Sequence, residues 1–191
     1  MVWTNLCRFV LGVTFIFSGF VKADDPWGTA YKIEDYVYAF GWSDFVPSFL
    51  PLFLSCLLSV FEFTLGVYLF FGIRKRLTSI AVALVMVCMT PFTLYLALAN
   101  PVADCGCFGD ALKLTNWETF WKNVVLLVLA LWLFKHYRLV VKFISKKNQW
   151  VISMYGIFYG IGIVGYCLYA LPIFDFRPYY IGANIPRQMT I

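Results

Sequence analysis

The chain has 191 residues, of which 62% are hydrophobic, 20% aromatic and only 13% charged, and it carries a formal net charge of +5. This composition excludes a soluble domain, because so apolar a chain would expose large apolar patches to water. We therefore expect an all-α integral membrane protein that has the lipid bilayer as its first partner and has no nucleic-acid partner.

Five apolar stretches are long enough to cross a bilayer as helices, since one crossing needs about 20 residues. In chain order they cover roughly residues 4–21, 49–72, 77–99, 118–134 and 150–172. The first is expected to remain in the protein, because no small-x-small cleavage site of a secretory signal precedes Lys22. Before the fourth, Thr115-Asn116-Trp117-Glu118 has the pattern of a capping box, which opens a helix.

The basic residues predict the orientation, because cytoplasmic loops are enriched in Lys and Arg. With a cytoplasmic N-terminus, the inner side carries no acid and has these basic residues: Arg8, Arg74, Lys75, Arg76, Lys135, Arg138, Lys142, Lys146 and Lys147. The outer side then carries the other basic residues, diluted by nine of the ten carboxylates. We predict a multi-pass membrane protein with its N-terminus in the cytoplasm and its C-terminus on the outer side, which is the periplasm if the cell is a diderm bacterium.

The short polar gap after the third span contains Cys105 and Cys107, separated by one glycine. A disulfide between residues i and i+2 closes a small ring far from relaxed geometry, so it is easily reduced. The pair is therefore our candidate catalytic site, for thiol–disulfide exchange. Two alternatives stay open, a static disulfide that shapes the loop and a metal site. We expect no metal, because two sulfurs lack the further ligands of a closed site and His136, the only histidine, lies on the opposite side.

Four charged neighbours are candidate modulators of the thiol pair. Asp104 and Asp110 would raise the pKa of a nearby thiol, whereas Lys113 and Lys122 would lower it. The two effects oppose each other, so the sequence does not give the direction of the net pKa shift of either thiol.

Glu62 is the only acid in the interior of a span, where a charge costs several kcal/mol unless it is paired or neutralised. Arg8 lies less deep when both are counted from the cytoplasmic ends, and its long side chain covers much of the difference. We predict a structural ion pair between Arg8 and Glu62. The alternatives are that Arg8 extends to the headgroups and that Glu62 is a buried neutral acid.

Several short motifs lie in and around the spans: Arg8-Phe9-Val10-Leu11-Gly12, Ser18-Gly19-Phe20-Val21-Lys22, Glu62 with Leu65-Gly66, Asp104-Cys105-Gly106-Cys107-Phe108-Gly109-Asp110, and Trp117-Glu118-Thr119-Phe120-Trp121-Lys122-Asn123 leading into Leu126-Leu127. Together they resemble the DoxX-like/MauE family of bacterial inner-membrane proteins. The resemblance covers about residues 1–135, and its most specific part is the cysteine motif with the following Lys122-Asn123. It implies a four-helix bundle and thiol–disulfide work on the outer face of the membrane, because MauE is linked to maturing a disulfide-rich methylamine dehydrogenase subunit with a thioredoxin-like partner.

The resemblance implies a four-helix membrane domain over residues 1–135. A basic cytoplasmic connector at 136–149, a fifth transmembrane helix at 150–172 and a periplasmic tail at 173–191 would follow. Two functions stay open. The first is a thiol–disulfide redox protein, or an electron-passing subunit, that acts on a thioredoxin-like or other periplasmic protein. The second is a non-catalytic assembly or scaffold subunit that joins a larger membrane complex through the fifth helix and the tail.

The other four cysteines lie in separate spans and are interpreted as packing residues. Without a second outward-facing pair, electrons must pass to another protein or to a lipid-soluble carrier. A quinone among the aromatic residues of the spans is one such carrier, although aromatic residues are common at membrane interfaces in any case. We therefore assign no cofactor and retain a quinone as a candidate.

Overall fold

Six α-helices make up most of the described chain in the computed structural model, which describes residues 1–102, 105–109, 111–174 and 176. They are α1 (Val2–Asp24), α2 (Pro26–Ala39), α3 (Leu50–Phe71), α4 (Lys75–Ala99), α5 (Asn116–Lys135) and α6 (Gln149–Tyr169). Two short 3-10 turns, η1 (Tyr137–Leu139) and η2 (Lys146–Asn148), lie between α5 and α6.

The all-α membrane fold and its five predicted spans are confirmed. Helices α1, α3, α4 and α5, and the segment Lys146–Tyr169 that contains α6, are long and apolar enough to cross a bilayer. The last helix ends at Tyr169, earlier than the predicted residue 172, because Pro172 follows shortly after. The chain is thus a multi-pass membrane protein.

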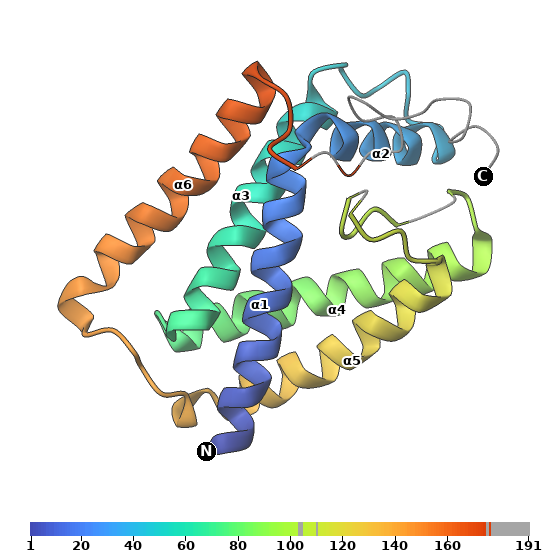
Figure 1. Ribbon diagram of the computed structural model, residues 1–191. Helices are drawn as coiled ribbons and strands as arrows, with labels where there is room; N and C mark the ends of the chain where they lie inside the picture. The colour runs from blue at the N-terminus through green and yellow to red at the C-terminus, as the bar shows by residue number, and fades with distance from the viewer. Residues whose placement is uncertain (103–104, 110, 175, 177–191) are drawn as a thin grey trace.

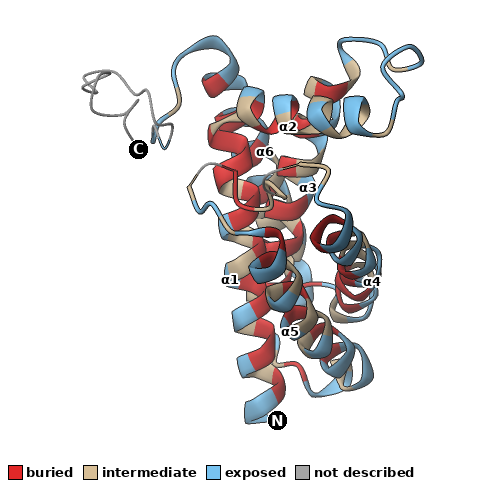
Figure 2. Ribbon diagram, turned by 90° about the vertical axis from the view of Figure 1, so that its right-hand side faces the viewer, coloured by how far each residue is buried: buried red, intermediate tan, exposed pale blue. Residues whose placement is uncertain are grey.

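The spans form two pairs and one outlying helix (Figure 1). Helix α1 packs mainly on α3, α4 packs mainly on α5, and α6 lies against α3. Helix α2 lies across one end of the α1–α3 pair. In Figure 2, buried residues lie on the sides of the helices that face one another, and exposed residues lie on the outer sides. The main core joins the two pairs through Leu11, Leu69, Val82 and Leu126.

Two glycines set the register between α1 and α3. A Cβ on Gly19 would overlap the backbone of Phe63, and a Cβ on Gly66 would overlap the backbone at Ile16. Small residues let transmembrane helices approach this closely. As a result Glu62, next to Phe63, lies level with the last turns of α1.

The capping box predicted at the start of α5 is present. The backbone N–H of Thr115 donates to Glu118 Oε2 at 2.9 Å, and the backbone N–H of Glu118 donates to Thr115 Oγ1 at 3.3 Å. These two bonds satisfy amides that the first turn of a helix leaves without partners. They fix where the cysteine loop, residues 100–115, ends.

Helix α2 was not predicted from the sequence. Asp25 caps its start, because its Oδ1 accepts the backbone N–H of Gly28 at 2.9 Å, and Pro26 occupies the first turn. With 14 residues α2 is too short to cross a bilayer. Trp27 and Tyr31 on its outer side are exposed, while its inner side covers the end of the bundle.

Helix α6 is fastened to the bundle along its length and after its end. Gly156 and Gly160 face valines of α3, so this small-residue pair packs within the chain. After the helix, the fully buried carboxylate of Asp24 accepts the backbone N–H of Ile173 at 2.9 Å and that of Phe174 at 3.2 Å. The segment after α6 is thereby tied to the last turn of α1.

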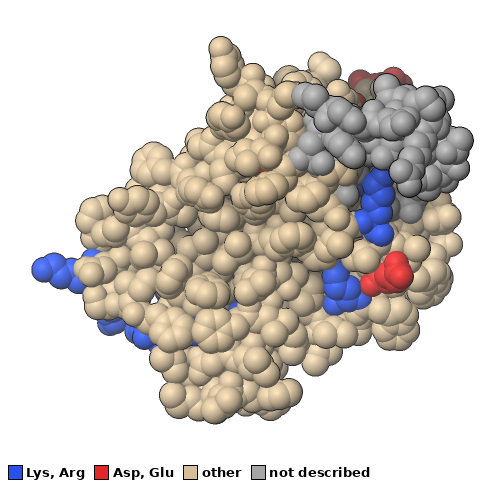
Figure 3. Space-filling model, viewed as in Figure 1, with Lys and Arg blue, Asp and Glu red and all other residues tan. Residues whose placement is uncertain are grey.

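The two ends of the bundle differ in charge. We call the end with α2 and the cysteine loop the thiol end, and the opposite end, with Met1 and the α3–α4 turn, the basic end. A groove at the basic end is lined by five cations: Arg74, Lys75, Arg76, Lys142 and Lys146. Most of the molecular face in Figure 3 carries no charged side chain, as a lipid-exposed surface requires.

Candidate functional site

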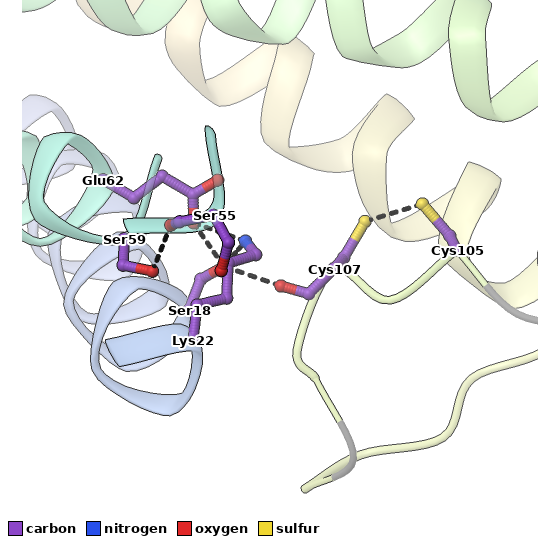
Figure 4. Close-up of polar contacts among 7 residues, drawn as sticks. All are labelled: Ser18, Lys22, Ser55, Ser59, Glu62, Cys105 and Cys107. Atoms are coloured by element: carbon purple, nitrogen blue, oxygen red, sulfur yellow. Dashed lines mark hydrogen bonds and ion pairs between the residues drawn. The ribbon is translucent and has the colours of Figure 1, made fainter. Parts of the chain in front are cut away.

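The two cysteines of the loop meet at the thiol end (Figure 4). Their Sγ atoms are 2.9 Å apart, and both cysteines are free thiols. Gly106 between them has a φ of 66°, in the left-handed region that favours glycine. A Cβ at this position would also overlap the side chain of Lys32 on α2. Gly106 therefore permits both the turn of the loop and its close contact with α2.

Two helices hold this turn by its backbone carbonyls. The Tyr36 hydroxyl on α2 donates to the carbonyl oxygen of Cys105 at 2.9 Å. The Ser18 hydroxyl on α1 lies 2.7 Å from the carbonyl oxygen of Cys107. Each cysteine is thus positioned by a different helix, and the orientation of the thiol pair depends on how α1 and α2 pack.

A buried ion pair lies behind Cys107 (Figure 4). Lys22 Nζ is 2.6 Å from Glu62 Oε2, and the two side chains are 6% and 8% exposed. Lys22 also donates to Ser18 Oγ at 2.9 Å, and Ser18 Oγ lies 2.7 Å from the same Glu62 oxygen. A hydroxyl has one hydrogen, so Ser18 donates either to Glu62 or to the Cys107 carbonyl. Ser18 therefore joins the ion pair to the cysteine loop.

The predicted pair between Arg8 and Glu62 is wrong. Arg8 Nη1 donates to the carbonyl oxygen of Val141 at 2.6 Å, at the basic end. The register of α1 on α3 places Arg8 roughly 18 Å along the helix from the level of Glu62, at about 1.5 Å per residue. The predicted first span stopped at residue 21, so Lys22 was counted outside it, whereas α1 continues to Asp24 and carries Lys22 to the buried acid.

The two thiols have unequal acidity. The hydrogen bond between the two sulfurs is the largest cause that lowers the pKa of Cys107, and Lys122 and Lys22 act in the same direction, whereas burial and Glu62 oppose them; together they lower this pKa to about 6. The same hydrogen bond, together with burial, raises the pKa of Cys105. These shifts favour Cys107 over Cys105 as the thiolate of the pair, with the remaining proton in the hydrogen bond between the two sulfurs. The thiolate is the form that reacts.

The four predicted modulators differ in where they lie. Lys122 on α5 is at the site, with Nζ 4.0 Å from the ring centre of Phe108, the residue after Cys107. Lys113 is exposed. Asp104 and Asp110 lie outside the described residues.

A cavity of about 140 Å³ adjoins the thiol pair and extends between the helices. The residues that line it include the charged Lys22, Glu62 and Lys122 and the apolar Met86, Met89 and Phe92. In the described parts of the chain, no three His, Cys, Asp or Glu side chains gather as a metal ion would need. The mixture of charged and apolar side chains around the cavity suits a small organic group that carries polar atoms.

Three residues of this site, Ser18, Lys22 and Tyr36, were not predicted from the sequence to belong to it. Ser18 and Lys22 are four residues apart and lie on one helix face, so their spacing, together with the intramembrane acid Glu62, was a usable signal. Tyr36 carried no such signal, because its contact with the loop depends on α2 folding back over the end of the bundle.

Comparison with known proteins gave one result. Neither the curated proteins nor the solved structures contain a match to the chain. The family described as Methylamine utilisation protein MauE matches residues 1–136, which include all of α1 to α5 and the cysteine loop. The match covers well over half of the chain. The chain therefore belongs to the MauE family of membrane proteins.

Proposed function

We propose that the protein is an inner-membrane thiol–disulfide redox protein that acts through Cys105 and Cys107 on a thioredoxin-like partner in the periplasm. The observation that carries the proposal is the pair itself, with sulfurs 2.9 Å apart and with the pKa of one thiol lowered to about 6 by the other thiol and two nearby lysines. Membership of the MauE family supports a role at the membrane in methylamine utilisation.

The unequal acidity supports an order of events. When the pair is a disulfide, a partner thiolate attacks Cys105, and Cys107 leaves as a thiolate stabilised by Lys122 and Lys22. A thiol of low pKa is the better leaving group. A second partner thiolate then attacks the mixed disulfide and releases Cys105. Two partner thiols are thereby oxidised to a disulfide, and the Cys105–Cys107 disulfide is reduced to two thiols.

Trapping in intact cells tests this function. In Cys107→Ser, the Cys105 thiolate can still attack the disulfide of an oxidised partner and release one partner thiolate, which is the reverse of the second step. No Cys107 remains to displace the partner from Cys105, so a mixed disulfide with the partner should accumulate. After acid quenching, it should appear as a reductant-sensitive band on a non-reducing gel, and mass spectrometry should identify the linked protein. Cys88→Ser, which alters an exposed cysteine of α4, is the matched control and should trap nothing.

The reciprocal variant tests the order. Cys105→Ser should trap less partner than Cys107→Ser, because Cys105 is the sulfur that the partner attacks. Equal trapping by both variants would contradict the proposed order of attack but would leave the redox function in place. If neither variant traps a protein and envelope disulfides mature normally in both, the redox function is wrong and the scaffold function replaces it.

A further inference from the structure

We propose that the cavity beside the thiol pair binds the ring of a lipid-soluble quinone, which accepts two electrons from Cys105 and Cys107. This inference rests on the proposed function, because it names the electron acceptor of the same site. It follows from three properties of the cavity: its size, the cationic and apolar side chains that line it, and the presence of both cysteines in its wall.

The size fits a single six-membered ring. The cavity measures about 140 Å³, and an engineered protein cavity on the order of 150 Å³ holds benzene. Met86, Met89 and Phe92 of α4 supply an apolar wall, and methionine and aromatic side chains pack well against flat rings. An isoprenoid tail would leave through the opening of the cavity.

The lysines of the cavity wall suit the oxygens of a quinone. Lys22 and Lys122 place ammonium groups on the cavity wall next to the thiols. A quinone oxygen accepts hydrogen bonds, and it gains negative charge as the ring is reduced. A cation nearby stabilises that charge more strongly in an apolar site than in water. The lysines that lower the pKa of Cys107 would therefore also favour the reduced ring.

The bilayer is the source of the ligand. Val85, Met89 and Phe92 line the cavity and are only half-buried on α4, and we infer that the cavity opens along this helix toward the lipid, where quinones dissolve. The other cysteines offer no competing route, because Cys7, Cys56, Cys88 and Cys167 belong to four different helices. A reduced pair at this site thus needs an acceptor from outside the chain, and the cavity admits one from the membrane.

The redox step balances with one quinone for each thiol pair. The Cys107 thiolate and the Cys105 thiol form one S–S bond and release two electrons and one proton. The ring takes both electrons, the proton from Cys105 and a second proton drawn from water through a lysine ammonium group. The products are a Cys105–Cys107 disulfide and a hydroquinone. The oxidised pair is then ready to oxidise a further partner.

The test uses the full chain, reduced and desalted in detergent, with ubiquinone-1. Every ring carbon of this quinone is substituted, so that it does not simply alkylate thiols. We expect the ultraviolet absorbance of the oxidised ring to fall as free thiols disappear, with one ring reduced for each pair. Reaction with oxidised glutathione is measured in parallel, because it reports thiol–disulfide exchange without the cavity.

Filling the cavity should separate the two reactions. Met89→Trp should slow quinone reduction on the order of a hundredfold, because a displaced ring no longer meets the thiols. Its reaction with oxidised glutathione should stay near the wild-type rate. Val87→Trp, an exposed position of α4 two residues away, is the matched control and should leave both reactions unchanged. Val85→Phe adds less volume and replaces Met89→Trp if the latter does not fold.

The outcomes distinguish the two proposals. If wild type exchanges with oxidised glutathione but leaves ubiquinone-1 oxidised, the quinone site is wrong and the proposed function stands. Quinone reduction at the wild-type rate in folded Met89→Trp or Val85→Phe would also overturn the site, because reduction would then occur elsewhere. If the thiols react with neither compound, the proposed function fails together with the quinone site.

Discussion

At the scale of single residues, the acidity of Cys107 is assembled from several parts of the chain. The thiol of Cys105 comes from the same loop, Lys22 from α1 and Lys122 from α5. No one segment makes an acidic thiol alone. The site therefore depends on the tertiary fold, and its reactivity can be changed without touching either cysteine.

The reactivity of Cys107 should depend on pH in a direction that its pKa fixes. Because that pKa is lowered to about 6, alkylation by iodoacetamide should rise as the pH passes through about 6 and level off above it. The alkylation rate of an unperturbed cysteine would instead rise as the pH passes through about 8.5. Mass spectrometry of Cys107 after timed labelling measures the profile, and a midpoint above 8 would contradict it.

Lys122→Met should move this profile to higher pH. Without the Lys122 cation the Cys107 thiolate is less stable, so the midpoint of the labelling profile should rise by roughly one pH unit. Labelling of Cys107 at pH 6 should therefore slow. Lys113→Met is the matched control, because Lys113 is exposed and its removal should leave the midpoint unchanged. An unchanged midpoint in Lys122→Met would show that Lys122 does not act on the thiol.

The buried ion pair gives a second prediction at this scale. Lys22→Met leaves Glu62 as an uncompensated buried acid and should destabilise the protein by about 3–5 kcal/mol. Lys22→Met combined with Glu62→Leu should recover much of this loss. Thermal unfolding in detergent measures both variants. Arg8→Met provides the comparison, because Arg8 lies far from Glu62 and its effect should simply add to that of Glu62→Leu.

At the scale of helices, the glycine contacts between α1 and α3 decide which polar residues meet. Gly19 and Gly66 bring the two backbones together and hold Glu62 level with the last turns of α1. A shift of one helical turn would move Glu62 by about 5.4 Å along the axis, away from Lys22 and from the loop. Packing by small residues is thus a condition for the ion pair and for the placement of Cys107.

Gly19→Ala tests this condition. The added Cβ would overlap the backbone of Phe63, so the helices must separate, at a cost of about 1–3 kcal/mol. The Cys107 pKa should rise as well, because the cysteine loop loses its contact with α1. In contrast, Gly162→Ala on α6 adds a Cβ where no atom lies within 4 Å and should change neither quantity. Equal melting temperatures for the two variants would contradict the role of Gly19.

The helices also show which parts of the fold could be predicted from the sequence. The spans could be predicted because a bilayer demands long apolar stretches, and the start of α5 because capping is local. Helix α2 was missed, although Asp25 and Pro26 marked its start, since it is too short and too polar to register as a span. The partner of Glu62 was missed for a different reason: it depends on the register between two helices, which no single segment encodes.

At the scale of the whole molecule, the charges divide the protein into two ends. The cations predicted for the inner side include Arg74 and Lys146, which line one groove at the basic end, while the thiol pair lies at the other end. The positive-inside rule then predicts that the basic end faces the cytoplasm. The redox proposals depend on this orientation, because an oxidising compartment must lie on the side of the thiols.

Cysteine labelling tests the orientation directly. The variant with Cys105→Ser and Cys107→Ser serves as the background, because its remaining cysteines lie within the spans. Lys113→Cys in the cysteine loop should react with a membrane-impermeant maleimide in intact bacterial cells, whose outer membrane has been made porous. Lys146→Cys at the basic end should react only after the inner membrane is opened. The opposite pattern would place the thiol pair in the cytoplasm, where glutathione keeps thiols reduced, and periplasmic disulfide exchange could then not be its function.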